Sequence, residues 1–477
     1  MKDYDFIAIG TGSAISIIDA LLQENPELKI AAIDKDDPGG ICLTRGCIPS
    51  KLLLYPAEVV RTIESARRFG IEANVRNIDF STVMERMRTL IQTDIDMIRN
   101  GLKHSPNIDY YPTQAEFVAP YTLKVGDETI TSKTIFLCTG SKPKIPPIRG
   151  LDRVKYHTSD TVLKMTQLPL SIIIVGGGYI AAEYGFFFSA MGSKVTIVGR
   201  NPQFLPKVEP EISAVASKKL QKHMKILTNH EVREVREASG KNIVLAVNRA
   251  NGKEVEISAD EILIASGRSP NTDILHPEKG GIDVDERGWI TVNEHLETSK
   301  PNIWALGDAN GHHLFKHVAN YESQIVYYNA VLKEDVSVDY HAIPYAVFSH
   351  PEIAGVGMGE KEAIERYGKE GVLIGMQRYE DTAKGKAMDV KDFFVKVIVE
   401  RNTLKILGAH IVGNHASILI QEIINLMYTP EQTAIPLVRG MHIHPALSEV
   451  VQRAFNSLMS PEEYHHLIGH HHKLPTD

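Results

Sequence analysis

Two stretches of this 477-residue chain share one order of local signals, and this repetition constrains the fold more than any other feature. Each begins with a short apolar strand, passes through a glycine-rich turn into a helix, and ends with a second apolar strand. The first stretch covers 6–34 and the second covers 172–200. This order is typical of a Rossmann-type dinucleotide-binding unit. The sequence therefore predicts an α/β fold with two such domains.

The glycine turns indicate what the two units bind. Gly10-Thr11-Gly12 opens the first helix, and Gly176-Gly177-Gly178 opens a second helix that carries Glu183. Such turns let backbone N–H groups and the positive end of a helix approach a pyrophosphate closely. One turn alone is also compatible with a tight turn that binds nothing, but two in the same frame make that interpretation improbable. Ile15 departs from the pattern, because a small residue normally stands there.

The residues that end the second strand of each unit differ. Asp34 lies 22 residues after Gly12, where an acid that binds a ribose is expected. The second unit instead ends in Gly199-Arg200, and a nearby arginine accommodates the 2′-phosphate of NADP. Arg200, with Lys207 as a second charge, therefore favours NADPH over NADH. An exposed arginine with dual specificity is the alternative.

The strongest chemical signal is the segment 42–51, Cys-Leu-Thr-Arg-Gly-Cys-Ile-Pro-Ser-Lys. Its two thiols are close enough in sequence to form a disulfide that closes a very short loop. Pro49 suits the first turn of a helix, so we expect Cys47 at a helix N-terminus, where the partial positive charge favours a thiolate. Lys51 follows Cys47 by four residues and falls on the same helical face. A zinc site would need two further ligands, and no second cysteine pair exists.

Composition excludes several other classes of protein. The formal net charge of −7 gives no basic excess for nucleic acid, and no apolar run approaches the ~20 residues that span a bilayer. Three cysteines are too few for a secreted disulfide scaffold of this size, and Cys138 is interpreted as a buried small hydrophobe. We therefore expect a cytoplasmic protein that binds neither nucleic acid nor a membrane.

The remaining patterns outline the organisation of the chain. Apolar residues between Met84 and Leu102 recur at spacings of three and four, which predicts one long amphipathic helix. The proline-rich stretch 142–147 predicts a linker, since proline removes ladder donors and fixes an extended chain. The segment from Ile343 onward contains no glycine-rich phosphate turn and predicts a separate C-terminal α+β domain.

Six motifs that occur in chain order are typical of one family. They are Gly39-Gly40-Ile41-Cys42 through Lys51, Thr139-Gly140-Ser141-Lys142-Pro143, Gly176-Gly177-Gly178-Tyr179-Ile180-Ala181-Ala182-Glu183, Gly267-Arg268-Ser269-Pro270-Asn271, Gly307-Asp308 and His444-Pro445-Ala446-Leu447-Ser448-Glu449. In these motifs the chain resembles the pyridine nucleotide-disulfide oxidoreductases, the group of dihydrolipoamide dehydrogenase, glutathione reductase and mercuric reductase. The resemblance covers about residues 4 to 456.

The resemblance implies a domain order and an assembly. It implies an FAD-binding domain over 1–149 and 272–342, an NAD(P)-binding domain over 150–271, and a C-terminal α+β dimerisation domain over 343–477 with a histidine-rich tail. It also implies a homodimer in which each active site is shared between subunits. The cofactors implied are FAD and NADPH or NADH, and no metal is expected.

The resemblance also implies site residues. Gly10, Gly12 and Asp34 would hold FAD, Lys51 would lie by the flavin and pair with Glu183, and Asp308 would contact the ribitol-phosphate region. The full set of implied cofactor-binding residues is Gly10, Gly12, Ser13, Asp34, Gly40, Lys51, Thr139, Gly140, Gly176, Gly178, Tyr179, Ile180, Glu183, Arg200, Gly267, Arg268, Gly307, Asp308, His317 and Ala319. Tyr179 is similar to a tyrosine lid over the nicotinamide, with ordinary packing as the alternative. Lys316 stands where the family commonly has alanine.

The implied catalytic residues are Cys42, Cys47, His444, Glu449, Lys51 and Glu183. Electrons would pass from the nicotinamide through the flavin to Cys47, opening its bond to Cys42, which would attack the substrate disulfide. His444 would move the thiol proton across the subunit interface, and an imidazole suits that task near neutral pH. Glu449 is the expected partner that orients the ring. A histidine before a proline is by itself also compatible with a capping role, and the cysteine motif decides between the two.

The function implied is an FAD-dependent dithiol/disulfide oxidoreductase with a dihydrolipoamide dehydrogenase-like frame, which reduces a small disulfide with NADPH. A mercuric or metal-ion reductase, or an NAD(P)H oxidase, is one alternative, although no C-terminal cysteine pair is present. A flavoprotein subunit of a 2-oxoacid dehydrogenase complex is another. The histidines of the tail, 465, 466 and 470–472, suit weak metal chelation or a frayed terminus.

Overall fold

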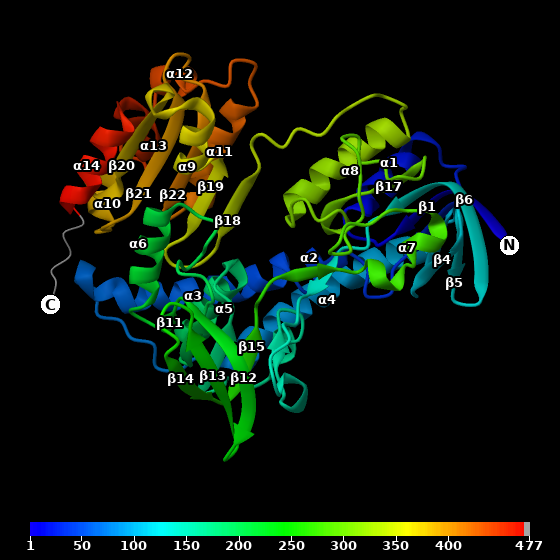
Figure 1. Cartoon of the computed structure of the whole chain (residues 1–477), viewed down its shortest axis with the longest axis horizontal. Helices are drawn as coiled ribbons and strands as arrows, with labels where there is room; N and C mark the ends of the chain where they lie inside the picture. The colour runs from blue at the N-terminus through cyan, green and yellow to red at the C-terminus, as the bar shows by residue number, and fades with distance from the viewer. Residues whose placement is uncertain (472–477) are drawn as a thin grey trace. The chain divides into compact units, whose positions relative to one another are not determined.

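The computed structural model describes residues 1–471 (Figure 1). The chain forms two compact units. Unit 1 comprises 1–176, 234–244 and 258–339, and unit 2 comprises 177–233, 245–257 and the chain from Tyr340 onward. The division falls inside the second glycine turn, between Gly176 and Gly177. Three strands cross it: β12 (His230–Ala238), β13 (Lys241–Asn248) and β14 (Glu254–Ala259).

Unit 1 alternates strands and helices. Its strands are β1 (Lys2–Ile9), β2 (Ile30–Ile33), β3 (Ile108–Tyr111), β4 (Ala115–Ala119), β5 (Thr122–Val125), β6 (Glu128–Leu137), β7 (Ser141–Pro143), β8 (His157–Thr158), β9 (Ser171–Val175), β15 (Glu261–Ile264), β16 (Arg268–Pro270) and β17 (Ile303–Ala305). Its helices are α1 (Ala14–Glu24), α2 (Gly40–Thr44), α3 (Cys47–Ser65), α4 (Phe80–His104), α7 (Pro277–Gly280) and α8 (Lys316–Ala330).

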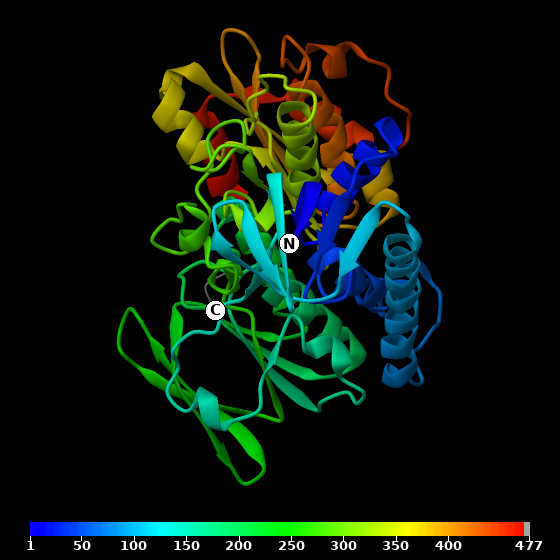
Figure 2. The ribbon, with the colours of Figure 1, turned by 90° about the vertical axis from the view of Figure 1, so that its right-hand side faces the viewer.

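The main sheet of unit 1 has the order β3-β2-β1-β6-β5-β4, with β17 also paired to β6. Strand β1 runs parallel to both neighbours, so that Ile7 lies opposite Ala31 and Ile135. Alternate residues of β1 enter different cores: Ile7 packs with β4 and β5, whereas Ala8 packs with α1 and α8. Figure 2 shows the long helix α4 beside the strands of this sheet, and α4 contacts β3, α2 and α3. Strand β1 ends at Ile9 and α1 begins at Ala14, so the first glycine turn joins a strand end to a helix start, as predicted.

The second strand–turn–helix–strand stretch is confirmed element by element. Strand β9 ends at Val175, α5 (Tyr179–Met191) follows the turn, and β10 (Lys194–Val198) follows α5. Within unit 1, β15 pairs in parallel with β9 and β8, and within unit 2, β10 pairs in parallel with β11 (Lys225–Leu227). The predicted α/β class is confirmed.

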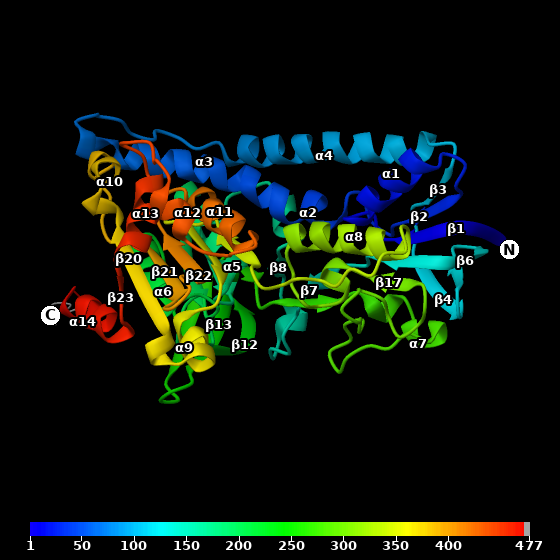
Figure 3. The same ribbon diagram turned by 90° about the horizontal axis from the view of Figure 1, so that it is seen from above.

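Unit 2 also holds an antiparallel sheet of order β18-β19-β22-β21-β20-β23. Its strands are β18 (Pro344–Val347), β19 (Ile353–Gly357), β20 (Val372–Arg378), β21 (Phe394–Glu400), β22 (Ile406–Val412) and β23 (Leu458–Met459). The other helices of unit 2 are α6 (Pro210–Leu220), α9 (Glu360–Tyr367), α10 (Ala383–Ala387), α11 (Ala416–Met427), α12 (Ile435–Arg439), α13 (Ser448–Asn456) and α14 (Pro461–His471). In Figure 3, α11 and α13 lie on one side of the sheet and α9 and α14 on the other. This segment is the α+β domain that the sequence predicts.

Two local predictions have different outcomes. The long amphipathic helix is confirmed as α4, which buries Met84, Met87, Ile91, Ile95 and Leu102. The proline-rich linker is partly wrong, because Ser141–Pro143 forms β7, which pairs antiparallel with β16. Pro143 is tolerated there because a two-stranded ribbon leaves one strand edge without a ladder partner. None of the helices of residues 1–471 combines the length and apolarity needed to cross a membrane.

Candidate active site

The two cysteines of the redox segment lie at the junction of two helices. Cys42 is in α2, Gly46 is the N-cap of α3, and Cys47 is the first residue of α3, as predicted. A Cβ on Gly46 would lie 2.8 Å from the carbonyl oxygen of Ile41, so the tight turn between the helices requires glycine. The side chains of Cys42 and Cys47 hydrogen bond to each other, and this bond together with burial raises the pKa of Cys42. Both cysteines are in the reduced, dithiol state, and their side chains are in contact at the positive end of a helix.

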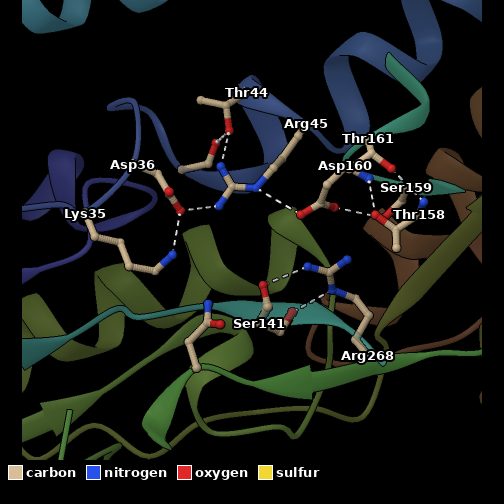
Figure 4. A network of polar contacts seen from close by, with 12 residues as sticks. Lys35, Asp36, Thr44, Arg45, Ser141, Thr158, Ser159, Asp160, Thr161 and Arg268 are labelled. Carbon is tan, nitrogen blue, oxygen red and sulfur yellow. Dashed lines mark hydrogen bonds and ion pairs between the residues drawn. The ribbon is translucent and has the colours of Figure 1, made fainter. Parts of the chain in front are cut away.

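Arg45 holds this segment to two other parts of unit 1 (Figure 4). Its Nη2 lies 2.5 Å from the Oδ2 of Asp36, which follows β2, and its Nε lies 3.2 Å from the Oδ2 of Asp160, which follows β8. Burial raises the pKa of Asp36, but Lys35 and Arg45 outweigh it, so the net pKa is lowered and the carboxylate stays charged. The guanidinium therefore fixes the loop between the two cysteines against two strand ends.

Replacing Arg45 with methionine is expected to destabilise the fold by about 1–2 kcal/mol, because two partly buried carboxylates lose their shared cation. The measurement is urea unfolding followed by circular dichroism. Lys35→Met is the matched control, since it removes only an exposed partner of Asp36, 3.0 Å away, and is expected to cost less than about 0.5 kcal/mol. Equal effects of the two substitutions would contradict the role of Arg45.

The first glycine turn fits the phosphates of a dinucleotide. Gly10 has φ +101°, and a Cβ there would lie 2.1 Å from the carbonyl oxygen of Cys138. A Cβ on Gly40 would lie 2.6 Å from the Cα of Gly12, so α1 and α2 begin against each other. The hydroxyl oxygen of Thr139 is buried and has no hydrogen-bond partner among the described residues. An unsatisfied buried hydroxyl beside a glycine cradle is the condition that a bound cofactor would relieve.

Asp34 lies at the end of β2, as predicted for a ribose-binding acid. Its Oδ2 accepts hydrogen bonds from the backbone N–H and hydroxyl of Thr11, at 2.8 and 2.6 Å, and its Oδ1 accepts one from the N–H of Asp36. Burial raises the pKa of Asp34, although the bonds from Thr11 act against this. The carboxylate thus fixes the glycine turn itself, and its contact with a ribose stays a prediction.

Two predicted cofactor-binding residues, Arg268 and Asp308, meet at Ser141 of β7. Arg268 donates from Nε to the Ser141 hydroxyl at 2.6 Å and from Nη2 to the Ser141 carbonyl at 2.8 Å (Figure 4). The Ser141 hydroxyl donates to Asp308, and burial raises the pKa of Asp308. Asp308 is therefore held by a hydroxyl donor beside β7, and its contact with the ribitol-phosphate region stays a prediction.

The segment 307–322 contains one buried acid that sequence reasoning missed. Glu322 is fully buried, and its Oε2 accepts hydrogen bonds from the N–H of Gly307 and from Asn310 at 3.1 Å. Ala319 packs against Gly307, and His317 stacks on Phe315 with 5.2 Å between ring centroids. The sequence signal for this residue was weak: Glu322 is an acid that follows Ala319 by one helical turn.

The second glycine turn repeats the geometry of the first. Gly176 has φ +141°, and a Cβ there would lie 2.2 Å from the carbonyl oxygen of Ala265. After the turn, Tyr179 stacks on Tyr345 with centroids 5.7 Å apart, and burial raises its pKa to about 12. Glu183 in α5 accepts a hydrogen bond from the N–H of Phe348 at 3.1 Å. Gly178 and Ile180 flank Tyr179 at the start of α5.

Arg200 lies just beyond β10 and is exposed. Its carbonyl accepts a hydrogen bond from Arg249 at 3.2 Å, and in the described part of the chain its guanidinium forms no ion pair. Lys207 is exposed as well. A free guanidinium at the end of this strand is available to an anionic ligand.

The structure brings His444 and Glu449 together, as predicted. Nδ1 of His444 lies 3.0 and 3.1 Å from the two carboxylate oxygens of Glu449. Glu449 also accepts from the N–H of Ala446 and from Arg453, and the bond from His444 is the largest cause that lowers its pKa. The charged carboxylate fixes the proton on Nδ1 and leaves Nε2 to react, on a side chain that is 66% exposed.

Each of the remaining predicted pairs has one member in unit 1 and the other in unit 2. Cys42, Cys47 and Lys51 belong to unit 1, whereas Glu183 and His444 belong to unit 2. The Lys51–Glu183 pair and the proton transfer between His444 and a thiol therefore stay predictions. Of the histidine-rich tail, the side chains of residues 470–472 lie outside the described residues.

Comparisons with known proteins show which proteins this chain resembles. The family model described as pyridine nucleotide-disulphide oxidoreductase matches residues 4–324, and the model of that family's dimerisation domain matches 343–455. Mycothione reductase of Mycobacterium tuberculosis is 37% identical over 477 residues, covering 96% of this chain and 100% of that protein. Dihydrolipoyl dehydrogenase of Synechocystis is 34% identical, covering 95% and 98%. The HOCl-induced flavoprotein disulfide reductase RclA of Escherichia coli superposes with a TM-score of 0.84 at 28% identity, covering 95% and 99%.

Proposed function

The chain belongs to the pyridine nucleotide-disulphide oxidoreductase family, whose members use FAD and NAD(P)H, and from this premise we propose that it reduces a small symmetrical disulfide with NADPH. Membership of this family makes the chain an FAD-dependent disulfide oxidoreductase with a dimerisation domain. The observation that carries the proposal is the pair of contacting thiols, Cys42 and Cys47, at the N-terminus of α3.

The protein residues perform the exchange in two balanced steps. His444 takes the proton of the Cys42 thiol, whose pKa is raised, and the resulting thiolate attacks one sulfur of the substrate. The substrate S–S bond breaks, and the leaving thiolate takes that proton back from His444. Cys47 then attacks the sulfur of Cys42 and forms the Cys42–Cys47 disulfide, and the proton that the Cys47 thiol loses passes to the second substrate sulfur as it leaves. Bound FAD, once reduced by NADPH, would supply the two electrons that return this disulfide to the dithiol. Each cycle thus consumes one disulfide and produces two thiols.

The substrate class that we propose is the disulfide of a low-molecular-weight thiol. Mycothione reductase gives one named candidate, mycothione. The absence of an acid after β10 supports NADPH as the electron donor, because Arg200 occupies that place. A second candidate, oxidation of dihydrolipoamide with NAD, is favoured by the 34% identity to dihydrolipoyl dehydrogenase.

Anaerobic reduction of the purified protein with NADPH and NADH in parallel tests both candidates. The reduced protein is then mixed with mycothione, glutathione disulfide or lipoamide, and flavin absorbance follows reoxidation. The proposal expects faster reduction by NADPH and reoxidation by one of the two soluble thiol disulfides. Preference for NADH together with lipoamide would overturn it in favour of a dihydrolipoyl dehydrogenase.

Replacing Arg200 with alanine is expected to raise the KM for NADPH about 10–100-fold and to change that for NADH less than about twofold, because a charge-assisted bond to the 2′-phosphate is lost. Steady-state kinetics with both coenzymes measures this. Lys222→Ala, another exposed cation of the same unit, is the matched control. Equal losses with both coenzymes would contradict the role of Arg200 in coenzyme choice.

A further inference from the structure

Lys316 reaches from one helix of unit 1 to the start of another. It is the first residue of α8, and its Nζ donates a hydrogen bond to the hydroxyl oxygen of Ser13 at 2.8 Å. Ser13 is the N-cap of α1, directly after the turn that contains Gly10 and Gly12, and its hydroxyl donates to Asn320 of α8 at 3.1 Å. The ammonium group is therefore fixed at the N-terminus of α1.

The charge of Lys316 is poorly compensated by the protein. No carboxylate of residues 1–471 forms an ion pair with it, and burial lowers its pKa, while only the thiols of Cys42, Cys47 and Cys138 act to raise it. The ammonium also lies at the positive ends of α1 and α8, where a cation is unfavourable. These conditions favour an anion beside Lys316.

A fully buried lysine in unit 2 shows how this chain stabilises such a charge. Lys396 in β21 is fully buried, and its Nζ lies 2.5 to 2.7 Å from carboxylate oxygens of Glu209, Glu211 and Glu360. These carboxylates outweigh burial, and the pKa of Lys396 is raised. Lys316, by contrast, is bonded to the hydroxyl of Ser13 and pairs with no carboxylate of the described residues, so a bound anion would supply the counter-ion that it lacks.

We propose that Lys316 is a cofactor-binding residue whose ammonium pairs with the diphosphate of FAD. The glycine turn before Ser13 lets backbone N–H groups approach phosphate, and the helix dipole adds to their attraction. Lys316 adds a full positive charge to these partial charges, in a half-buried place where it is weakly screened. The proposal concerns retention of the cofactor and holds whichever disulfide is the substrate.

Titration of the full-length apoprotein with FAD, followed by flavin fluorescence, tests the proposal. Lys316→Met is expected to raise the Kd for FAD about 10–100-fold, since it removes a charge-assisted contact. ADP, which has the diphosphate and no flavin, is expected to lose affinity by a similar factor when it competes with FAD. Lys316→Arg keeps the charge and is expected to stay within about threefold of the wild type.

Lys333→Met is the matched control, because Lys333 lies beyond the C-terminal end of the same helix and donates to the carbonyl of Ala330. It is expected to leave both affinities unchanged. An FAD affinity of Lys316→Met within twofold of the wild type would overturn the proposal. Weaker FAD binding with unchanged ADP binding would overturn it too, because the charge would then act on the flavin or on the thiols. Thermal unfolding of each apoprotein confirms that the compared variants are folded.

Discussion

Replacing Cys42 with serine is expected to lower disulfide turnover by at least about 10³-fold while FAD stays bound. A serine hydroxyl is not ionised near neutral pH, so it cannot replace the thiolate that attacks the substrate. The side chains are nearly equal in size, and Cys42 is only partly buried, so the fold is expected to tolerate the change. Stopped-flow reduction and steady-state turnover, each with a flavin spectrum, measure the two halves of the prediction.

Cys138→Ala is the matched control for this substitution. Cys138 follows β6 and packs against the core that contains α1 and α8, and burial raises the pKa of its thiol well above the usual range. Neither step of the proposed exchange uses the Cys138 thiol, so turnover of Cys138→Ala is expected within about twofold of the wild type. If Cys42→Ser kept its turnover, dithiol chemistry would be wrong, and the oxidase or metal-ion reductase alternative would be favoured.

Replacing Cys47 with serine is expected to stop the reaction after Cys42 has attacked the substrate and before the mixed disulfide is broken. Cys42 can still exchange with the substrate, releasing one thiol, but no second thiol remains to break the mixed disulfide. We therefore expect one substrate half to stay bound to Cys42, and mass spectrometry of the intact protein detects it. A protein without the adduct, but with normal turnover, would show that Cys47 is not the resolving thiol.

Local chemistry explains which parts of the site could be predicted. Gly10 and Gly176 each need a positive φ next to a neighbouring strand, and Cys47 needs a helix start, so their signals lie within a few residues. His444 and Glu449 lie five positions apart, within reach of one turn. Such features follow from short-range geometry, and the structure places them as expected.

Contacts between distant segments could not be predicted in the same way. Ser141 and Arg268 are 127 positions apart, and only the pairing of β7 with β16 brings them together. The prolines of 142–147 suggested a linker because proline disfavours strands, yet a two-stranded ribbon accepts one. Arg45 gave no signal at all, since its partners Asp36 and Asp160 lie on different strand ends.

The burial of Lys396 in the core is another feature that could not be predicted from the sequence. It stands within the apolar run Phe394–Glu400, where alternation alone would direct a lysine toward solvent. The helices α6 and α9 instead bring three glutamates to that face, and Tyr464 of α14 lies over the ammonium, 4.9 Å from ring centroid to Nζ. Burial of a charge depends on partners that only the fold assembles.

Replacing His444 with glutamine is expected to lower kcat for disulfide reduction about 10²–10⁴-fold, because the leaving thiolate loses its proton donor. The amide keeps a polar side chain of similar reach but cannot transfer a proton near neutral pH. Glu449→Gln is expected to have a smaller effect, about tenfold, because the imidazole remains but loses the charge that fixes its tautomer. His442→Gln is the matched control: His442 lies two residues away and pairs with Glu422 at 3.8 Å.

Mixing two inactive variants tests whether the site is shared between subunits. In a heterodimer of Cys42→Ser and His444→Gln, a shared arrangement creates one site with both native residues and one site with neither. Random exchange of subunits makes half of the dimers hybrid, so about one quarter of the wild-type activity should return. If Cys42 and His444 of the same chain worked together, every site would keep one defect and no activity would return. The recovered fraction therefore distinguishes a site completed by the partner subunit from a site contained in one chain.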